Sequence, residues 1–212
     1  MLNIPHIDFP SVDLADEDGL LAIGGILHPS IILSAYKLGI FPWYNEDEPI
    51  LWWSPNPRFV LYPDKLKISK SMRPYLNGNK YRFTVNRNFG AVIQQCGMVP
   101  RKDQDGTWIT DDIINCYTQL HQQGNALSAE AWEEGQLVGG LYGVKIGKIF
   151  FGESMFSLKP NASKFAFIQL VQQLKKEGVV LIDCQIYSEH LESMGAEMMS
   201  RPQFCNILQL NC

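Results

Sequence analysis

Several features that define common protein classes are missing from this 212-residue sequence. No apolar run reaches the ~18 residues that a membrane-spanning helix needs. The first ten residues carry acid and proline where a signal peptide would carry basic residues and an apolar stretch. No two of the five cysteines form a C-x-x-C pair, and none of the four histidines stands at metal-ligand spacing from another histidine or a cysteine. We therefore expect a cytoplasmic protein with reduced thiols, no metal site and no membrane anchor.

Acidic side chains are absent from residues 65–102, which hold nine of the 18 basic residues. The rest of the chain holds nine basic and 22 acidic residues, so +9 and −13 give the net charge of −4. Such a basic block indicates a surface that faces a polyanion, because the local field steers association. An ordinary solvated face is the alternative. The block's expected contact residues are Lys65, Lys67, Lys70, Arg73, Lys80 and Arg82.

The composition changes near Pro57, where we place a domain border. Residues 1–57 are rich in proline, glycine and aromatic residues and carry eight acids. Their one clear helical pattern begins at Ile31, with Ser30 as the expected N-cap and Gly39 as the stop signal. We predict a small amino-terminal domain over 1–57 and a larger domain over 58–212.

The larger domain alternates between strand and helix patterns. Polar–apolar alternation and turn glycines predict strands over 81–85, 126–132, 136–145 and 148–154. Apolar stripes with capping residues predict helices over 111–123 and 161–177. A continuous apolar run predicts a strand over 179–186 that is buried on both faces. We expect an α+β fold with a mixed sheet flanked by helices, the layout of GNAT-type acetyltransferases.

Polar residues inside apolar strand patterns are the candidate site. Asp183 and Gln185 are two apart in the buried run, so regular alternation would place both side chains on one face. A buried carboxylate needs a partner, and a satisfied structural network is the alternative to a site. Glu153 stands between aromatic residues at a strand end, which favours a cation-binding slot or, alternatively, a loop cap.

Motifs that bind phosphate-containing cofactors are missing from the sequence. It contains no G-x-x-x-x-G-K-[ST], no G-x-G-x-x-G and no G-x-S-x-G motif. The nearest approach to the [RQ]-x-x-G-x-[GA] loop that binds coenzyme A in acetyltransferases begins at Gln136, inside a predicted strand. We therefore expect an acyl donor other than coenzyme A, and the basic block points to a nucleic acid as the carrier.

From about Asp18 to Phe204 the sequence resembles the bacterial leucyl/phenylalanyl-tRNA–protein transferase family. The stretches that carry the resemblance are DGLLAIGG (18–25), AYKLGIFPWY (35–44), PILWWSPNPR (49–58), GTWI (106–109), LVGGLYGV (137–144), FGESMFS (151–157), NASK (161–164) and LIDCQ (181–185). The resemblance implies transfer of leucine, phenylalanine or methionine from aminoacyl-tRNA to proteins that begin with Arg or Lys, which marks them for N-end rule degradation. It also implies that no metal or coenzyme is needed.

The resemblance also implies roles for individual residues. Asp183 and Gln185 look like the catalytic pair, Glu153 like a substrate-contacting acid, and Trp108 like a wall for the terminal adenosine of the tRNA. The amino-acid pocket is expected to be lined by Met155, Leu170, Leu174 and Ile182. Tyr36 and Trp43 resemble residues of the amino-terminal domain that close over the site.

The chain departs from the family pattern in two places. Residues 125–132 lack both histidines of the usual H-A-H-S-[IV]-E-V-W, and Leu170 and Leu174 replace side chains that are often aromatic. Shorter side chains would reshape the acyl pocket. We expect a monomer, with a coenzyme A-dependent N-acetyltransferase or a non-catalytic tRNA-binding module as the alternatives.

Overall fold

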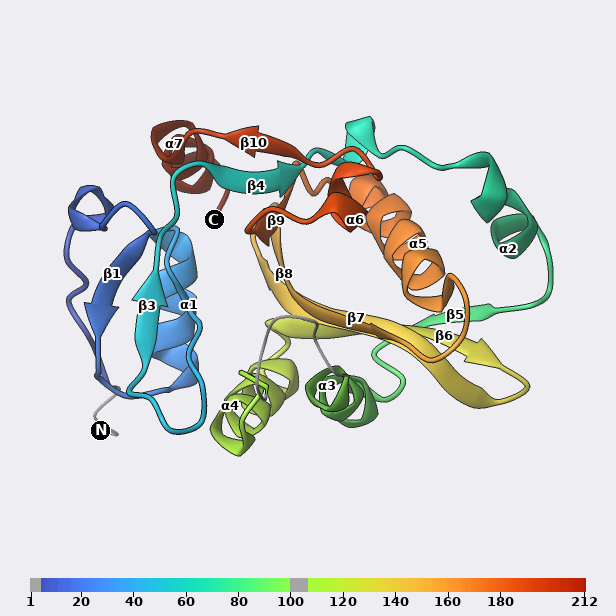
Figure 1. The fold of residues 1–212 in the computed structure, drawn as a ribbon, viewed down its shortest axis with the longest axis horizontal. Helices are drawn as coiled ribbons and strands as arrows, with labels where there is room; N and C mark the ends of the chain where they lie inside the picture. Colours follow the sequence, from blue (N-terminus) through green and yellow to red (C-terminus); the bar gives the residue numbers. More distant parts are fainter. Residues whose placement is uncertain (1–4, 100–106) are drawn as a thin grey trace.

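The computed structural model describes residues 5–99 and 107–212 and contains two sheets (Figure 1). The smaller sheet has the order β1-β3-β2 and lies in the amino-terminal part with helix α1. Its elements are β1 (Leu20–Ile23), α1 (Pro29–Lys37), β2 (Phe41–Pro42) and β3 (Leu51–Trp53), preceded by the 3-10 helix η1 (Val12–Leu14). All of its strand pairs are antiparallel.

The N-cap of α1 differs from the one predicted from the sequence. The ring of His28 accepts the backbone N–H of Ser30, so His28 caps the helix and Ser30 lies inside it. Pro29 takes the first helical position, where its missing N–H costs nothing. Gly39 follows the helix at a φ of 81°, as the stop signal predicts.

The larger sheet has seven strands in the order β10-β4-β9-β8-β7-β6-β5. Only the β8–β9 pair is parallel, and the other neighbours are antiparallel. Its strands are β4 (Arg58–Leu61), β5 (Arg82–Val85), β6 (Ala126–Glu133), β7 (Gln136–Ile146), β8 (Ile149–Ser157), β9 (Leu181–Gln185) and β10 (Glu197–Met199). The expected mixed sheet is therefore confirmed.

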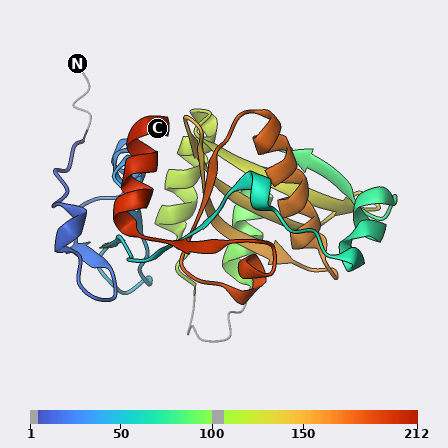
Figure 2. The ribbon, with the colours of Figure 1, turned by 90° about the horizontal axis from the view of Figure 1, so that it is seen from above.

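Helices cover both faces of this sheet (Figure 1). Helix α5 packs on one face, whereas α3 and α4 pack on the other, and α7 lies near α1 at the end where the chain terminates (Figure 2). The helices are α2 (Arg73–Asn77), α3 (Phe89–Met98), α4 (Asp111–Gln122), α5 (Ala162–Lys176), α6 (Glu189–Glu192) and α7 (Arg201–Asn211), with the 3-10 helices η2 (Pro63–Lys65) and η3 (Lys70–Met72). Among the described residues no helix combines the length and apolar character needed to cross a membrane.

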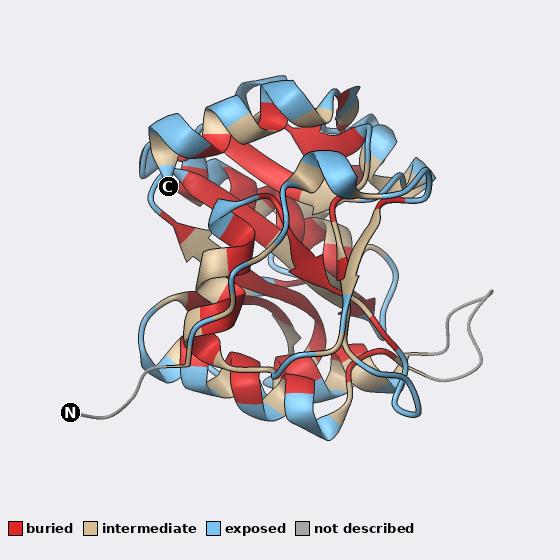
Figure 3. Ribbon diagram, turned by 90° about the vertical axis from the view of Figure 1, so that its left-hand side faces the viewer, coloured by how far each residue is buried: buried red, intermediate tan, exposed pale blue. Residues whose placement is uncertain are grey.

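The core forms two layers, one on each face of the large sheet. In Figure 3 the strands of this sheet are largely buried, whereas the helices alternate between buried and exposed residues. Successive residues of β8 point into opposite core layers. Phe150 packs with α5, and Phe151 packs with α1 and α4. The same alternation places Leu181 and Ile182 of β9 in different layers. The strand period of two therefore builds both layers at once.

Candidate active site

The candidate site lies where the two parallel strands separate. Strands β8 and β9 pair from Ile149 and Leu181 as far as Phe151 and Asp183, and both strands continue beyond that point. A cavity of about 550 Å³ opens there, and residues 152–155 and 182–188 line it. The cavity therefore takes side chains from the strand ends rather than from a single loop.

Asp183 is fully buried and is paired with Arg58, which is 1% exposed. The guanidinium donates from Nε to Oδ1 at 2.8 Å and from Nη2 to Oδ2 at 2.7 Å. Its Nη1 donates to the carbonyl of Gly39 at 3.2 Å, and the rings of Phe41 and Phe204 lie 4.6 and 4.8 Å from its central carbon. The partner that a buried carboxylate requires is therefore Arg58, the first residue of the predicted larger domain, to which the sequence analysis gave no role in the site.

Gln185 is linked to Asp183 through the backbone. Its N–H donates to Asp183 Oδ1 at 2.9 Å, while its side-chain amide donates to Glu153 Oε1 at 3.3 Å. Asp183 pairs with Val60 and Gln185 with Phe59, so Cys184 is an extra residue in β9. The regular alternation assumed for Asp183 and Gln185 is therefore wrong at this point, and Gln185 adopts a left-handed φ of 65°.

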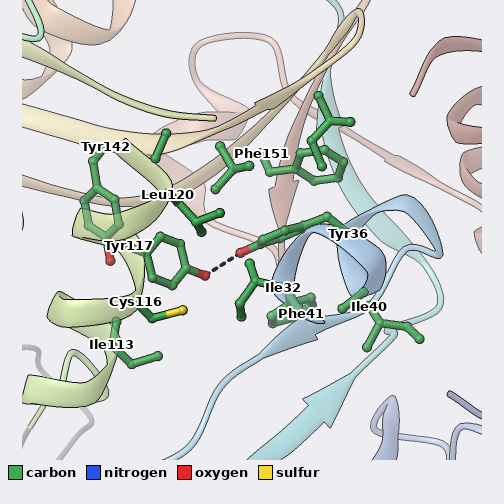
Figure 4. Close-up of a cluster of buried hydrophobic side chains, with 14 of the residues drawn as sticks. Ile32, Tyr36, Ile40, Phe41, Ile113, Cys116, Tyr117, Leu120, Tyr142 and Phe151 are labelled. Carbon is green, nitrogen blue, oxygen red and sulfur yellow. Dashed lines mark hydrogen bonds between the residues drawn. The ribbon is translucent and has the colours of Figure 1, made fainter. Parts of the chain in front are cut away.

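Glu153 also lies at an irregularity, since Gly152 pairs with Gly143 and Ser154 with Tyr142. Its carboxylate accepts the hydroxyl of Tyr36 at 2.5 Å and that of Tyr117 at 3.1 Å. The two hydroxyls also hydrogen-bond to each other, with 2.6 Å between their oxygens. Figure 4 draws this bond as a dashed line. The bulge thus turns the Glu153 side chain towards α1 and α4, where Tyr36 and Tyr117 donate hydrogen bonds to it.

Burial raises the pKa of Glu153 to about 7, and the charge of Asp183 adds to the rise, although both phenols and Arg58 oppose it. Burial also raises the pKa values of Tyr36 and Tyr117 well above the ordinary value, so both remain hydroxyl donors near neutral pH. Two hydroxyl protons serve three close oxygen–oxygen contacts. A proton on Glu153 would supply the third hydrogen bond that these contacts need. With a pKa of about 7, this carboxyl can gain and lose a proton near neutral pH.

The remaining cavity wall is mainly apolar, and Met155, Ile182, Trp43 and Trp108 all line it. Leu170 and Leu174 do not. Each is 1% exposed within the core that joins α5 to the sheet, and Phe167 is the α5 residue at the cavity. Tyr36 is not part of the wall either, but it reaches the site through Glu153.

Sequence reasoning missed four residues of the site: Arg58, Tyr117, Phe167 and His190. Phe167 had a signal, because it precedes Leu170 by three residues on the apolar stripe of α5. Arg58 and Tyr117 had none, since their partners Asp183 and Glu153 lie 125 and 36 residues away. His190 had none either, because only the folded chain brings it to the cavity wall.

The basic block is exposed where it is described. Lys65 pairs with Glu197 at 2.6 Å, and Lys80 lies over the stacked rings of Tyr75 and Tyr81. Five further basic residues of the block are also exposed: Lys67, Lys70, Arg73, Arg82 and Arg87. Arg101 and Lys102 lie outside the described residues.

Metal ligands do not gather in the described part of the chain, where no three His, Cys, Asp or Glu side chains come together as a binding group. Cys184 lies at the cavity, but burial raises the pKa of its thiol far above the ordinary value. The thiolate needed for nucleophilic attack is therefore disfavoured. Asp183, Gln185 and Glu153 remain the candidates for chemistry at the cavity.

A mainly apolar cavity with a carboxyl of raised pKa and a hydrogen-bonding amide suits a group-transfer enzyme, and similarity to known proteins places the chain among transferases. It belongs to the leucyl/phenylalanyl-tRNA protein transferase family. The model of that family matches residues 60–209, and the model of the family's N-terminal domain matches residues 25–56.

Relatives of the same name cover nearly the whole chain. The protein named leucyl/phenylalanyl-tRNA–protein transferase in Christiangramia forsetii is 59% identical over 96% of this chain and 97% of its own length. That of Flavobacterium johnsoniae is 54% identical over 95% of both chains. Among solved structures, a GCN5-related N-acetyltransferase from Kribbella flavida is 11% identical with a TM-score of 0.43, covering 81% of this chain and 61% of the other.

The raised pKa of Glu153 makes a prediction about stability. Below about pH 4.5 the carboxyl is protonated in both folded and unfolded chains, and between 4.5 and about 7 only the unfolded chain gives up the proton. Its contribution to stability is therefore lost as pH rises through this window. Glu153→Gln should be about 1–3 kcal/mol more stable relative to wild type at pH 8 than at pH 5.

Urea unfolding at the two pH values measures this difference. Glu177→Gln is the matched control, because the hydrogen bond from Lys145 lowers the pKa of Glu177. This carboxyl is therefore ionised in both the folded and the unfolded chain at pH 5 and at pH 8, and the effect of its removal should be nearly the same at the two pH values. An equal effect of Glu153→Gln at both pH values would show that the carboxyl titrates normally.

Proposed function

We propose that this protein transfers leucine, phenylalanine or methionine from aminoacyl-tRNA to the α-amine of proteins that begin with arginine or lysine, which marks them for degradation. Family membership over nearly the whole chain is the observation that carries the proposal. The cavity supports it, because it combines an apolar wall for the acyl side chain with polar groups at the strand ends.

The reaction forms a peptide bond from an ester that is already activated. The amine nitrogen attacks the ester carbonyl carbon, the bond from that carbon to the ribose oxygen breaks, and the ribose hydroxyl leaves. The attacking nitrogen loses one proton, and the leaving oxygen gains one. An α-amine has a pKa of about 7.7–8.0, so a useful fraction is neutral near pH 7. Orientation of that amine is then the enzyme's main task.

Three residues carry the chemistry in this proposal. Gln185 orients the amine, and Asp183 positions Gln185 by holding its backbone N–H. Glu153 takes the proton from the attacking nitrogen, because it lies beside the Gln185 amide and has a pKa near 7. Tyr36 and Tyr117 hold this carboxyl in place.

In this proposal the aromatic and the aliphatic parts of the cavity wall contact different parts of the aminoacyl-tRNA donor. Trp43 and Trp108 would enclose the terminal adenosine, while Met155 and Ile182 would contact the acyl side chain. Exposed Lys65, Lys67, Lys70, Arg73, Lys80 and Arg82 would bind the tRNA backbone. In this proposal the protein acts as a monomer in the cytoplasm and needs no cofactor. Its amino-terminal domain ends at residue 57, and the larger domain begins at residue 58.

Mass spectrometry of an Arg-starting peptide tests the function directly. Incubation with leucyl-tRNA should add one leucine to the peptide, and a peptide whose α-amine is acetylated should remain unchanged. Acetyl transfer from acetyl-coenzyme A would support the N-acetyltransferase alternative. Binding of tRNA without any transfer, and without dependence on the attached amino acid, would support the non-catalytic alternative.

Charge reversal tests the tRNA surface. The combined change Lys67→Glu, Lys70→Glu and Arg73→Glu should weaken tRNA binding and lower the slope of log affinity against log salt by about two to three. Filter binding at several salt concentrations measures both effects. Reversal of three exposed lysines outside the block, Lys37, Lys148 and Lys176, is the matched control. Equal losses in the two triple variants would show only a general charge effect.

A further inference from the structure

His190 belongs to the cavity but has no part in the chemistry described above. It lies on the short helix α6, directly before Leu191, and its side chain lines the cavity. The hydroxyl of Ser193 donates to its backbone carbonyl at 2.7 Å, which holds this part of the helix. The ring therefore has a fixed attachment point at the wall.

The Nε2 atom of His190 is buried and has no hydrogen-bond partner among the described residues. A buried donor or acceptor left unpaired costs folding free energy, and a bound molecule that supplies the missing partner recovers that cost. This atom is therefore an unused polar contact in the cavity wall. It marks a position where a ligand atom that forms hydrogen bonds is favoured.

The position of His190 separates it from the reacting groups. Leu191 packs with the core layer on the α5 side, which contains the cavity residues Leu141, Phe167 and Ile182. Tyr36, Tyr117 and Trp108 belong to the layer on the opposite side. His190 thus lies on the side of the acyl side chain, away from the phenols that hold Glu153.

The imidazole is suited to an apolar neighbour because it is neutral. Burial lowers the pKa of His190, and the positive charge of Lys164 on α5 lowers it further. A neutral ring carries one N–H donor and one acceptor nitrogen. Its contact with a substrate is therefore a hydrogen bond rather than an ion pair.

We propose that His190 is a specificity-determining residue that donates a hydrogen bond from Nε2 to the thioether sulfur of a methionyl donor. This inference rests on the proposed function. Leucine and phenylalanine side chains offer no hydrogen-bond acceptor, whereas the methionine sulfur is a weak one. The contact compensates methionine for a flexible chain that costs more entropy to order than leucine.

Norleucine provides the matched substrate, because it has nearly the shape of methionine and a methylene in place of sulfur. The tRNA that accepts methionine is charged with either amino acid, and kcat/KM is measured for transfer to an Arg-starting peptide. Wild type should prefer methionine by about three- to tenfold, as expected for one hydrogen bond. His190→Phe keeps a ring of similar size without nitrogen and should bring the ratio to about one.

Two further variants separate the hydrogen bond from a packing effect. His190→Gln keeps an N–H donor and should restore part of the methionine preference. His121→Phe is the control, since His121 stacks on Phe89 and its Nδ1 lies 2.9 Å from the carbonyl of Ala126, outside the cavity. It should leave the ratio unchanged. Leucine transfer should change by less than about threefold in all of these variants.

A wild-type ratio near one, or a ratio that His190→Phe does not lower, would overturn the assignment. So would an equal loss of leucine, methionine and norleucine transfer in His190→Phe, because the imidazole would then contact a part common to all donors. These outcomes differ from failure of the proposed function, in which wild type transfers none of the three amino acids.

Discussion

The buried ion pair between Arg58 and Asp183 is the interaction on which the site depends. Two buried charges are costly to desolvate, and the cost is offset here because both groups are hydrogen-bonded and closely packed. The pair is bidentate, two aromatic rings flank the guanidinium, and its remaining nitrogen reaches the carbonyl of Gly39. Arg58 therefore joins the segment after α1, helix α7 and the end of β9 in one network.

This network also holds the backbone at the proposed catalytic residues. Asp183 Oδ1 accepts hydrogen bonds from both Arg58 and the N–H of Gln185, which has a left-handed conformation that a non-glycine residue rarely adopts. The bulge at Cys184 and the bulge at Glu153 lie on neighbouring strands, just beyond their last paired residues. The amide of Gln185 meets the carboxylate of Glu153 because both strands are irregular at the same level.

Much of the fold could be predicted because its elements are periodic. Helix α4 begins after Thr110, which caps it as expected, and strands β6 to β8 lie within three residues of their predicted ends. The 3.6-residue and two-residue patterns required by the two core layers are visible in a single sequence. The predicted cap of α1 was wrong because the helix begins at Pro29, with His28 accepting the N–H of Ser30, so Ser30 already lies inside the helix.

The site was less predictable because its geometry depends on bulges in β8 and β9 and on contacts between residues far apart in the sequence. The motifs pointed to Asp183, Gln185 and Glu153, and all three line the cavity. A strand pattern carries no sign of a bulge, so the backbone link between Asp183 and Gln185 was not foreseen. Arg58 and Tyr117 approach their partners across 125 and 36 residues, and only the folded sheet brings them together. Leu170 and Leu174 share the stripe of Phe167 but lie one and two turns further along α5.

A double-mutant cycle on the transfer rate tests most directly whether Arg58 acts through Gln185. Arg58→Lys keeps the positive charge but loses the bidentate geometry, and Gln185→Ala removes the side-chain amide. Urea unfolding would confirm that each variant is folded. We expect Arg58→Lys to lower the rate of leucine transfer about tenfold or more in wild type and less than about twofold in the Gln185→Ala background, since groups that act as one unit are non-additive. Equal, multiplicative losses in both backgrounds would contradict the account.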